Sequence, residues 1–380
     1  MKLQTFTYSS SGGWSRPDFP ALDSEHTLVL VFGASSFATQ PGALEALRSA
    51  YPRAHFAGCS TSGEIAGRAL CDESLSVAVA RFERTRLASA AADVARPEDS
   101  FTAGRELAER LAAPDLRAIL VLSDGLRVNG SELVRGLNSA LPESVVVTGG
   151  LAGDGDRFQR TWVIEQGRPQ SGSVRALAFY GAHVSIGHGS QGGWDIFGPE
   201  RLVTRSKGNV LHDLDGKPAL QLYKEYLGER ARGLPATALL FPLAIRERRE
   251  DTKLLVRTVL SVDEANQSMT FAGNIPEGFL AQLMRANLER LIEGAAQATL
   301  HALERMPDAH APVLAIAVSC VGRRLILGER AEEEIEAVLS LLPQGSSAVG
   351  FYSYGEISPW REGFCDLHNQ TMTLTTIAEE

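Results

Sequence analysis

The stretch HFAGCSTSGEI, residues 55–65, ends a pattern that the chain uses three times. It follows the apolar run VLVF at residues 29–32 and a helical segment that stops at Pro52. The unit is a short apolar strand, an amphipathic helix, a helix-ending proline, and a second apolar strand that leads into a glycine-rich loop with one carboxylate. A pattern that recurs in this way predicts a fold built from internal repeats.

Two further stretches follow the same pattern. In the second unit, ILVLSDG (119–125) precedes VVVTGGLAGD (145–154). In the third unit, VLAIAVSC (313–320) precedes AVGFYSYGEI (348–357). Apolar residues three and four apart between the two strands of each unit predict the helices.

An alternating stretch follows each glycine-rich loop and predicts a strand that returns to the same sheet. Continuous apolar strands that alternate with helices are typical of sheets covered on both faces. The sequence therefore predicts an α/β fold of pseudo-repeated strand-helix-strand units, which form mixed sheets covered by helices in two associated regions. The three returning stretches are residues 75–82, 174–179 and 371–377.

The repeats also suggest where the chain divides. Residues 1–27 precede the first unit and are expected to be an N-terminal extension, followed by one region at 28–227 and a second at 228–380. Residues 85–100, rich in Ala, Asp and Arg, are expected to be an exposed connection.

Two segments do not follow the repeat. Residues 181–227 contain glycine-rich turns and then a predicted helix that ends near Leu227. Residues 254–306 predict a strand pair and then a long helix through Leu288 and Ala295.

Composition excludes several classes of function. The net charge of −9 and the pI near 5.5 argue against a nucleic-acid or anionic-membrane partner. No apolar run is long enough to cross a bilayer, and the N-terminus lacks the apolar segment of a signal peptide. We therefore expect a cytoplasmic protein, in which the four cysteines are reduced thiols without a C-x-x-C pair.

A candidate ligand site lies at the carboxyl ends of the strands. Ligands bind there in open α/β sheets, because backbone amides and loop side chains converge. The three loop carboxylates are expected in corresponding places, and nearby aromatic side chains are expected to supply amphipathic walls. The predicted ligand-binding residues are Cys59, Ser60, Thr61, Glu64, Asp124, Gly150, Asp154, Trp194, Cys320, Arg323, Tyr352, Tyr354 and Glu356.

Other interpretations of these residues stay open. Each glycine-rich loop could be a tight turn only, each carboxylate could cap backbone amides, and the whole chain could serve as a scaffold. Cys59 and Cys320 each follow a strand, so either could be the nucleophile of a small-molecule amidase or hydrolase, with His55 on the same strand face as Cys59. A buried, inert thiol is the preferred interpretation of both. The motifs of serine hydrolases, zinc proteases, P-loop enzymes and dehydrogenases are absent from the sequence.

The histidines bear on a possible metal or haem. All eight are dispersed without ligand spacing, which disfavours a mononuclear zinc site. A haem needs only one axial histidine, so it remains possible. His188, between two glycines, and His212, before an aspartate, are predicted to lie in loops and are the candidates.

Six segments, taken together and in this order, resemble the signature segments of FIST proteins. The resemblance covers about residues 28–377, with an N-terminal and a C-terminal FIST region. The six segments are GCSTSGEI (58–65), VLSDGL (121–126), TGGLAGDG (148–155), LDGKPA (214–219), SCVGRR (319–324) and GFYSYGEI (350–357).

The resemblance implies an intracellular sensory module that binds a small molecule and signals to other proteins. Amino acids or related metabolites are the ligands suggested for the family. Some stand-alone members are haem-binding nitric oxide sensors that regulate histidine kinases or cyclic-di-GMP enzymes. The sequence contains no kinase, cyclase or methyl-accepting segment, so a signal would have to reach a separate partner protein.

Overall fold

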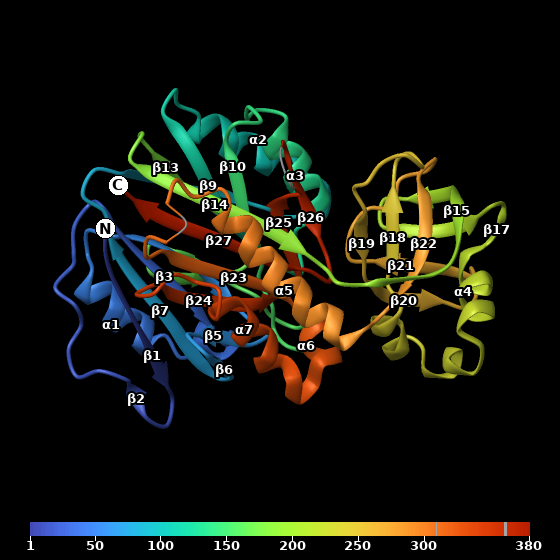
Figure 1. The fold of residues 1–380 in the computed structure, drawn as a ribbon, viewed down its shortest axis with the longest axis horizontal. Coiled ribbons are helices and arrows are strands. Elements are labelled where there is room, and N and C mark those ends of the chain that lie inside the picture. Colours follow the sequence, from blue (N-terminus) through green and yellow to red (C-terminus); the bar gives the residue numbers. More distant parts are fainter. Residues whose placement is uncertain (309, 361–362) are drawn as a thin grey trace.

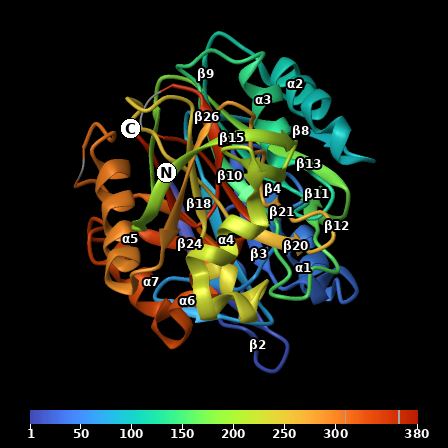
Figure 2. The ribbon, with the colours of Figure 1, turned by 90° about the vertical axis from the view of Figure 1, so that its right-hand side faces the viewer.

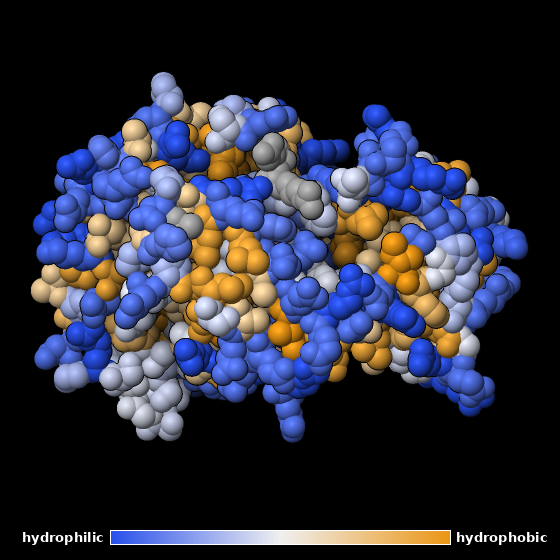
Figure 3. Space-filling view, in the orientation of Figure 1, coloured by the Kyte–Doolittle hydropathy of each residue, from blue (hydrophilic) through white to orange (hydrophobic). Residues whose placement is uncertain are grey.

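The chain folds into two lobes of unequal size (Figure 1). A computed structural model describes residues 1–308, 310–360 and 363–380. The larger lobe, here called the body, holds residues 1–194 and the described residues after 285. The smaller lobe holds residues 195–285 and is inserted into the third repeat. Figure 3 shows a notch at the boundary between the lobes, where apolar residues reach the surface.

The body consists of three α/β units, as the repeats predict. Each unit has one strand that precedes the repeat, the two apolar strands with a helix between them, and the returning strand. Unit one has β1 (Lys2–Ser9), β3 (Thr27–Gly33), α1 (Gly42–Ala50), β4 (His55–Ser60) and β7 (Ser74–Arg81). Unit two has β8 (Arg86–Asp93), α2 (Ser100–Leu111), β9 (Leu116–Ser123), α3 (Gly130–Asn138), β10 (Val146–Leu151) and β13 (Ser173–Tyr180). Unit three has β14 (Val184–Gln191), α5 (Leu288–Leu303), β23 (Leu314–Cys320), α6 (Val321–Leu327), α7 (Ala331–Leu339), β24 (Ser347–Ser353) and β27 (Met372–Glu379).

Strand order is the same in all three sheets. The two apolar strands of each unit are parallel, and the returning strand pairs antiparallel with the first of them. The preceding strand then pairs antiparallel with the returning strand at its other edge. This arrangement confirms the predicted mixed α/β sheets. At one equivalent position the second strand approaches the first so closely that an added Cβ would lie 1.8–2.0 Å from a carbonyl oxygen, and the residues there are Gly58, Gly149 and Gly350.

A hairpin from each unit crosses to the sheet of another unit and closes the body into a ring. From unit one, β5 (Glu64–Ala66) pairs with β24, and β6 (Ala69–Cys71) pairs with β5. From unit two, β11 (Val163–Glu165) pairs with β4, and β12 (Arg168–Gln170) pairs with β11. From unit three, β25 (Gly355–Pro359) pairs with β10, and β26 (Cys365–His368) pairs with β25.

Three backbone hydrogen bonds mark the centre of this ring. The amides of Ser62, Gly153 and Tyr354 each donate to a carbonyl of another unit, at 2.8, 2.9 and 3.1 Å. The acceptors are the carbonyls of Tyr352, Ser60 and Leu151. The glycine-rich loops therefore meet at one end of the ring, which is the end where the strands carry the predicted site residues.

Two segments differ from the sequence-based expectation. The first 27 residues are not an appendage, because β1 pairs with β7 along its whole length and β2 (Gly13–Trp14) pairs with β1. Residues 85–100 are not simply a connection, because half of them form β8, which pairs with β13. Small residues such as Ala88 and Ala90 disguise β8, which has few large apolar side chains.

The inserted lobe has its own sheet and its own apolar core (Figure 2). Helix α4 (Ala219–Leu227) packs on this sheet through Leu220 and Tyr223. The strands are β15 (Asp195–Lys207), β16 (Val210–Leu214), β17 (Lys217–Pro218), β18 (Leu243–Arg246), β19 (Leu255–Arg257), β20 (Val259–Asp263), β21 (Ser268–Phe271) and β22 (Leu280–Arg285). The five 3-10 helices of the described chain are η1 (Ser35–Ala38), η2 (Pro97–Asp99), η3 (Gly228–Gly233), η4 (Ala236–Leu240) and η5 (Gly328–Arg330).

A fully buried ion pair holds the two connections between the lobes. Arg323 donates to Glu334 through Nε at 3.0 Å and through a terminal nitrogen at 2.7 Å, and neither side chain is exposed. The same guanidinium donates at 2.5 Å to the carbonyl of Gly192, on the outgoing connection. It also donates at 2.7 Å to the carbonyl of Leu291, which follows the returning connection. Helix α6 therefore fixes the place where the chain leaves and re-enters the body.

Within the described ranges, no helix combines the length and the apolar character that a bilayer-spanning helix requires.

Candidate functional site

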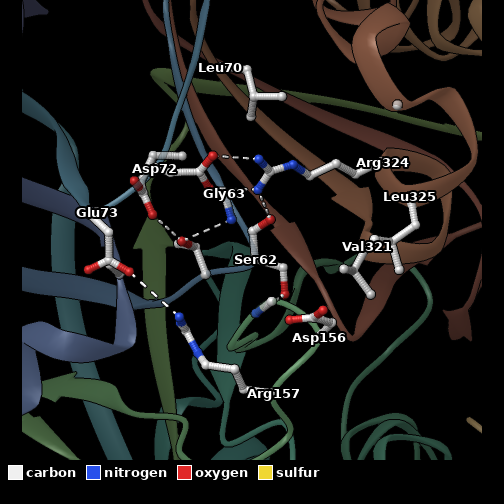
Figure 4. A pocket seen from close by; sticks show the side chains of 15 residues that line it. Ser62, Gly63, Leu70, Asp72, Glu73, Asp156, Arg157, Val321, Arg324 and Leu325 are labelled. Atoms are coloured by element: carbon white, nitrogen blue, oxygen red, sulfur yellow. Dashed lines mark hydrogen bonds and ion pairs between the residues drawn. The ribbon is translucent and has the colours of Figure 1, made fainter.

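A cavity of about 490 Å³ opens at the end of the ring where the glycine-rich loops meet (Figure 4). All three units contribute to it, and its lining holds four carboxylates and two guanidiniums. Unit one supplies Ala34, Thr61, Ser62, Gly63, Glu64, Leu70, Asp72 and Glu73; unit two supplies Gly155, Asp156 and Arg157; and unit three supplies Val321, Arg324, Leu325 and Gly328. The volume lies within the range of small-molecule sites.

Arg324 forms one wall of the cavity from helix α6. Its guanidinium donates to both carboxylate oxygens of Asp72, at 2.8 and 2.6 Å, and at 2.5 Å to the carbonyl of Ser62. The hydrogen bond to Asp72 raises the pKa of Arg324 further, so the charge is permanent. The Asp72 side chain is 64% exposed, which leaves this pair accessible to solvent.

Arg157 forms the opposite wall, as Figure 4 shows. It donates to Asp154 through Nε at 2.9 Å and through a terminal nitrogen at 2.8 Å. A second terminal nitrogen lies 3.6 Å from the carboxylate of Glu73, which also accepts a hydrogen bond from Ser36 at 2.8 Å. The two guanidiniums therefore face the cavity from different units, each next to an acid of the Asp72–Glu73 turn.

Asp154 orients Arg157 from behind. Burial disfavours its charge, but hydrogen bonds from Ser35, from the amides of Gln159 and Arg160, and from Arg157 keep its pKa below the usual value. The carboxylate stays ionised and holds the loop of unit two against η1. It lies behind Arg157 and does not line the cavity.

Glu64 lies in the cavity wall, almost fully buried. It accepts hydrogen bonds from the hydroxyl of Thr61 and from the amide and hydroxyl of Ser74, the latter two at 3.1 and 2.7 Å. Burial raises its pKa to about 7, against the opposing effect of these hydrogen bonds. Glu64 can therefore exchange a proton near neutral pH, beside the two arginines.

The expected correspondence of the three loop carboxylates holds for two of them. Glu356 accepts from Ser353 and Thr371 in the same way that Glu64 accepts from Thr61 and Ser74. Burial raises the pKa of Glu356 to about 8. Glu356 does not line the cavity. Asp154 lies one residue closer to Gly149 than Glu64 and Glu356 lie to the equivalent glycines of their own strands. The two glutamates fasten each loop to its returning strand, so this role is structural.

Thr61 also lines the cavity, whereas the other predicted residues lie around it. Tyr354 lies nearest, donating at 3.0 Å to the carbonyl of Gly155 and stacking on Phe158 at 4.7 Å. Tyr352 donates at 2.7 Å to Glu334, and Trp194 donates at 2.8 Å to the carbonyl of Gln370, near the lobe boundary.

The remaining predictions fall in buried structural positions. Ser60 accepts from the amide of Trp162 and thereby fastens the crossing hairpin of unit two. Asp124 accepts from three backbone amides at 2.8 Å and caps the turn after β9. Gly150 leaves room for Val318, because an added Cβ would lie 2.8 Å from that side chain.

The two cysteines do not have the surroundings of a nucleophile. Cys59 is fully buried in the central apolar core, and burial raises its pKa well above the usual value. Burial likewise raises the pKa of Cys320, with a further contribution from Glu356. His55 lies four strand positions from Cys59, about 13 Å along the strand, too far to act as its base.

The two candidate haem ligands do not fit a haem in this cavity. Both lie on strands rather than in the loops that the sequence suggested, His188 on β14 of the body and His212 on β16 of the inserted lobe. His188 is 5% exposed, with burial lowering its pKa to about 4. Neither histidine lines the cavity, and its lining contains no histidine, cysteine or methionine to serve as an axial ligand. No cluster of metal-ligating side chains occurs among the described residues.

Sequence reasoning missed both arginines of the cavity. It selected Arg323, which is the buried partner of Glu334, instead of its neighbour Arg324. Adjacent residues of a helix point about 100° apart, so one faces the lobe boundary and the other faces the cavity. Arg157 is the only basic residue between Gly155 and the exposed Phe158. This position, directly after the glycine-rich loop, is a signal by which it could have been found.

Comparison with protein families now assigns the chain. Residues 27–217 match the FIST N domain and residues 219–359 match the FIST C domain, so the chain belongs to the FIST family. These matches meet near residue 218, ten residues before the boundary expected from the sequence, and both cross the structural boundary of the inserted lobe at 195–285. FIST domains are associated with signal transduction and small-ligand sensing.

Two individual proteins were also found to be similar. An uncharacterized protein of Methanocaldococcus jannaschii is 25% identical in an alignment 245 residues long, which covers 56% of this chain and 45% of that protein. The chain therefore matches less than half the length of this relative. A crystal structure of cyanuric acid hydrolase from A. caulinodans covers 78% of this chain and 99% of its own, at 13% identity and a TM-score of 0.20. A TM-score of this size does not show a shared fold.

Proposed function

We propose that this FIST-family chain is a sensor, which binds a polar, amino-acid-like metabolite in the 490 Å³ cavity and regulates a separate partner protein. The single observation that carries this proposal is the cavity itself, which is walled by all three units and lined by charges of both signs. A zwitterion needs an acceptor for its ammonium group and a donor for its carboxylate. Asp156 offers a carboxylate and Arg324 a guanidinium in the lining of the same cavity.

Helix α6 supports the second part of the proposal, the passage of a signal. Arg324 faces the cavity, and Arg323 of the same helix holds the carbonyls of both connections to the inserted lobe. Leu327 of α6 packs in an apolar cluster with Ala244 and Met284 of that lobe. A ligand that moves Arg324 would therefore change how the inserted lobe seats on the body, through a helix shared by both sites.

We favour an amino-acid-like ligand over haem with nitric oxide, because the cavity offers charged groups and no axial ligand. A spectrum of the protein with one equivalent of haemin tests this preference. We expect the spectrum of free haemin, and a saturable Soret band that shifts with nitric oxide would contradict it. A histidine kinase or a cyclic-di-GMP enzyme is the class of partner proposed from the family resemblance.

Thermal unfolding with individual amino acids and related metabolites tests the main proposal. A ligand at 100 times its Kd should stabilise the protein by about 2.7 kcal/mol. The variant Arg324→Gln should lose this stabilisation. The control Arg205→Gln removes an exposed arginine that binds Asp213 at 2.6 Å in the inserted lobe, and it should keep the response. The proposal fails if no metabolite changes the unfolding temperature, or if both variants respond equally.

The second candidate function is a cysteine-dependent amidase or hydrolase. Chemical labelling at neutral pH distinguishes it, because a nucleophilic thiol reacts quickly and a buried thiol with a raised pKa does not. We expect half-buried Cys71 to react before Cys59 and Cys320. Rapid stoichiometric labelling of Cys59 or Cys320 in the folded protein would favour the enzyme.

A further inference from the structure

Both cavity guanidiniums contact acids from one tight turn of the chain. Asp72 and Glu73 are the two residues that connect β6 to β7, and Glu73 adopts the left-handed backbone conformation with φ of 50°. Asp72 binds Arg324 through both of its oxygens, and Glu73 lies 3.6 Å from Arg157. The turn thus presents two neighbouring carboxylates to two arginines that belong to different units.

These pairs are suited to exchange. The side chains of Asp72 and Glu73 are 64% and 57% exposed, and ion pairs with such exposure stabilise a protein only weakly. Their arginines, in contrast, are held in place by other groups. Arg324 also donates to the carbonyl of Ser62, and Arg157 also donates to the buried Asp154. The guanidiniums would keep their positions if the two acids of the turn withdrew.

The charge of the cavity becomes less negative when the turn withdraws. With Asp72 and Glu73 in place, the lining holds four acidic residues and two arginines. Without them, two arginines face Asp156 and the buried Glu64. Two guanidiniums on opposite walls then provide sites for two carboxylates of one ligand.

From this geometry we infer that the Asp72–Glu73 turn is a built-in competitor, which occupies the site of a small dicarboxylate ligand and is displaced when that ligand binds to Arg157 and Arg324. The inference rests on the proposed function, whose ligand class it narrows to compounds with two carboxylates, such as an acidic amino acid. The turn leads directly into β7, where the amide and hydroxyl of Ser74 donate to Glu64. Displacement of the turn would therefore also affect the start of β7.

Isothermal titration calorimetry of the full chain with three probes tests the ligand class. L-glutamate and glutarate each carry two carboxylates, whereas L-glutamine has one. We expect both dicarboxylates to bind, L-glutamine to bind at least about 10-fold more weakly, and Arg324→Gln to weaken both dicarboxylates to a similar degree. Equal binding of L-glutamine and L-glutamate would overturn the inference and leave the proposed function standing. Binding of none of the three would overturn the inference, and the wider metabolite panel would then decide the proposed function.

A variant of the turn tests the competition itself. Asp72→Asn removes the charge of a residue that lines the cavity. We nevertheless expect it to strengthen glutarate binding by up to about 5-fold, because Arg324 no longer has to release a carboxylate. Asp156→Asn is the matched control, since Asp156 is a lining acid for which the structure gives no guanidinium contact. A general effect of lost negative charge would strengthen glutarate binding equally in both variants, and this result would overturn the competition. Unchanged or weaker binding by Asp72→Asn would also overturn it.

Discussion

The change Glu334→Gln should destabilise the protein more than either Glu333→Gln or Glu379→Gln. Glu334 accepts four hydrogen bonds, two from Arg323 and one each from Ser319 and Tyr352, at 2.7–3.0 Å. Neither member of the Arg323–Glu334 pair is exposed. A neutral amide in place of the carboxylate leaves the guanidinium charge buried without a counter-charge, because the amide oxygen and the backbone carbonyls are neutral acceptors.

The magnitude follows from this burial. Removal of one partner of a buried ion pair costs about 3–5 kcal/mol, because the remaining charge keeps its desolvation penalty and loses its counter-charge. Glu333, the preceding residue, offers a matched comparison. It binds Arg330 at the same distance of 2.7 Å, but its side chain is 47% exposed. We expect Glu333→Gln to have little effect, since water replaces the lost contact.

Urea unfolding followed by far-ultraviolet circular dichroism measures both variants. The free energy of unfolding should fall by about 3–5 kcal/mol for Glu334→Gln, with the larger effect in the transition of the body. Tyr352→Phe, which removes one of the four hydrogen bonds, should lie between Glu334→Gln and Glu333→Gln. Equal losses for Glu333→Gln and Glu334→Gln would refute the reasoning, because they would show that burial does not decide the strength of these pairs.

Two further changes test the termini and the strand packing. The carboxylate of Glu379, 2% exposed, accepts from the amides of Glu83, Arg84 and Thr85, and although burial opposes ionisation these bonds lower its pKa to about 2. Its stabilising effect is therefore present above the unfolded pKa of about 4.5 and is lost between about pH 4.5 and 2. Glu379→Gln should lower the free energy of unfolding at pH 7 by about 2–3 kcal/mol and should make stability less dependent on pH in that window. An unchanged pH profile would contradict this. Gly58→Ala would place a methyl group 2.0 Å from the carbonyl of Val31 and should lower the free energy of unfolding by at least about 2 kcal/mol, whereas Gly42→Ala, with open space around it, should change stability by less than about 0.5 kcal/mol in the same urea assay.

The three repeats could be predicted because their strands are buried on both faces. Runs such as residues 29–32 and 313–320 are mostly apolar, because both faces of their sheets are covered. Helices pack on one face, and on the other face the three sheets share one apolar core. Strand β8 lacked this signal, since its residues are mainly small, and β1 lay before the first apolar run. β8 and β1 can be recognised as strands only by their pairing with β13 and β7, respectively. Both partners come later in the sequence.

The closure of the ring could not be predicted from the sequence. Strands β5, β11 and β25 are three to five residues long and pair with the sheet of another unit. A strand of that length has no local pattern that specifies a partner, because its pairing is decided by long-range geometry. The inserted lobe was missed for a related reason. Its strands have one exposed face. The two segments outside the repeat, 181–227 and 254–306, are separated by residues without a clear hydrophobic period.

The candidate site shows most clearly where sequence reasoning reaches its limit. Position after a strand correctly indicated the end of the sheet at which a cavity forms, and Thr61 and Glu64 do line it. Position alone did not indicate direction. Arg323 and Arg324 are chemically identical neighbours, yet α6 turns one toward Glu334 and the other toward Asp72. One residue of helical rotation therefore separates a structural ion pair from a candidate ligand contact, and both arginines belong to the same short helix.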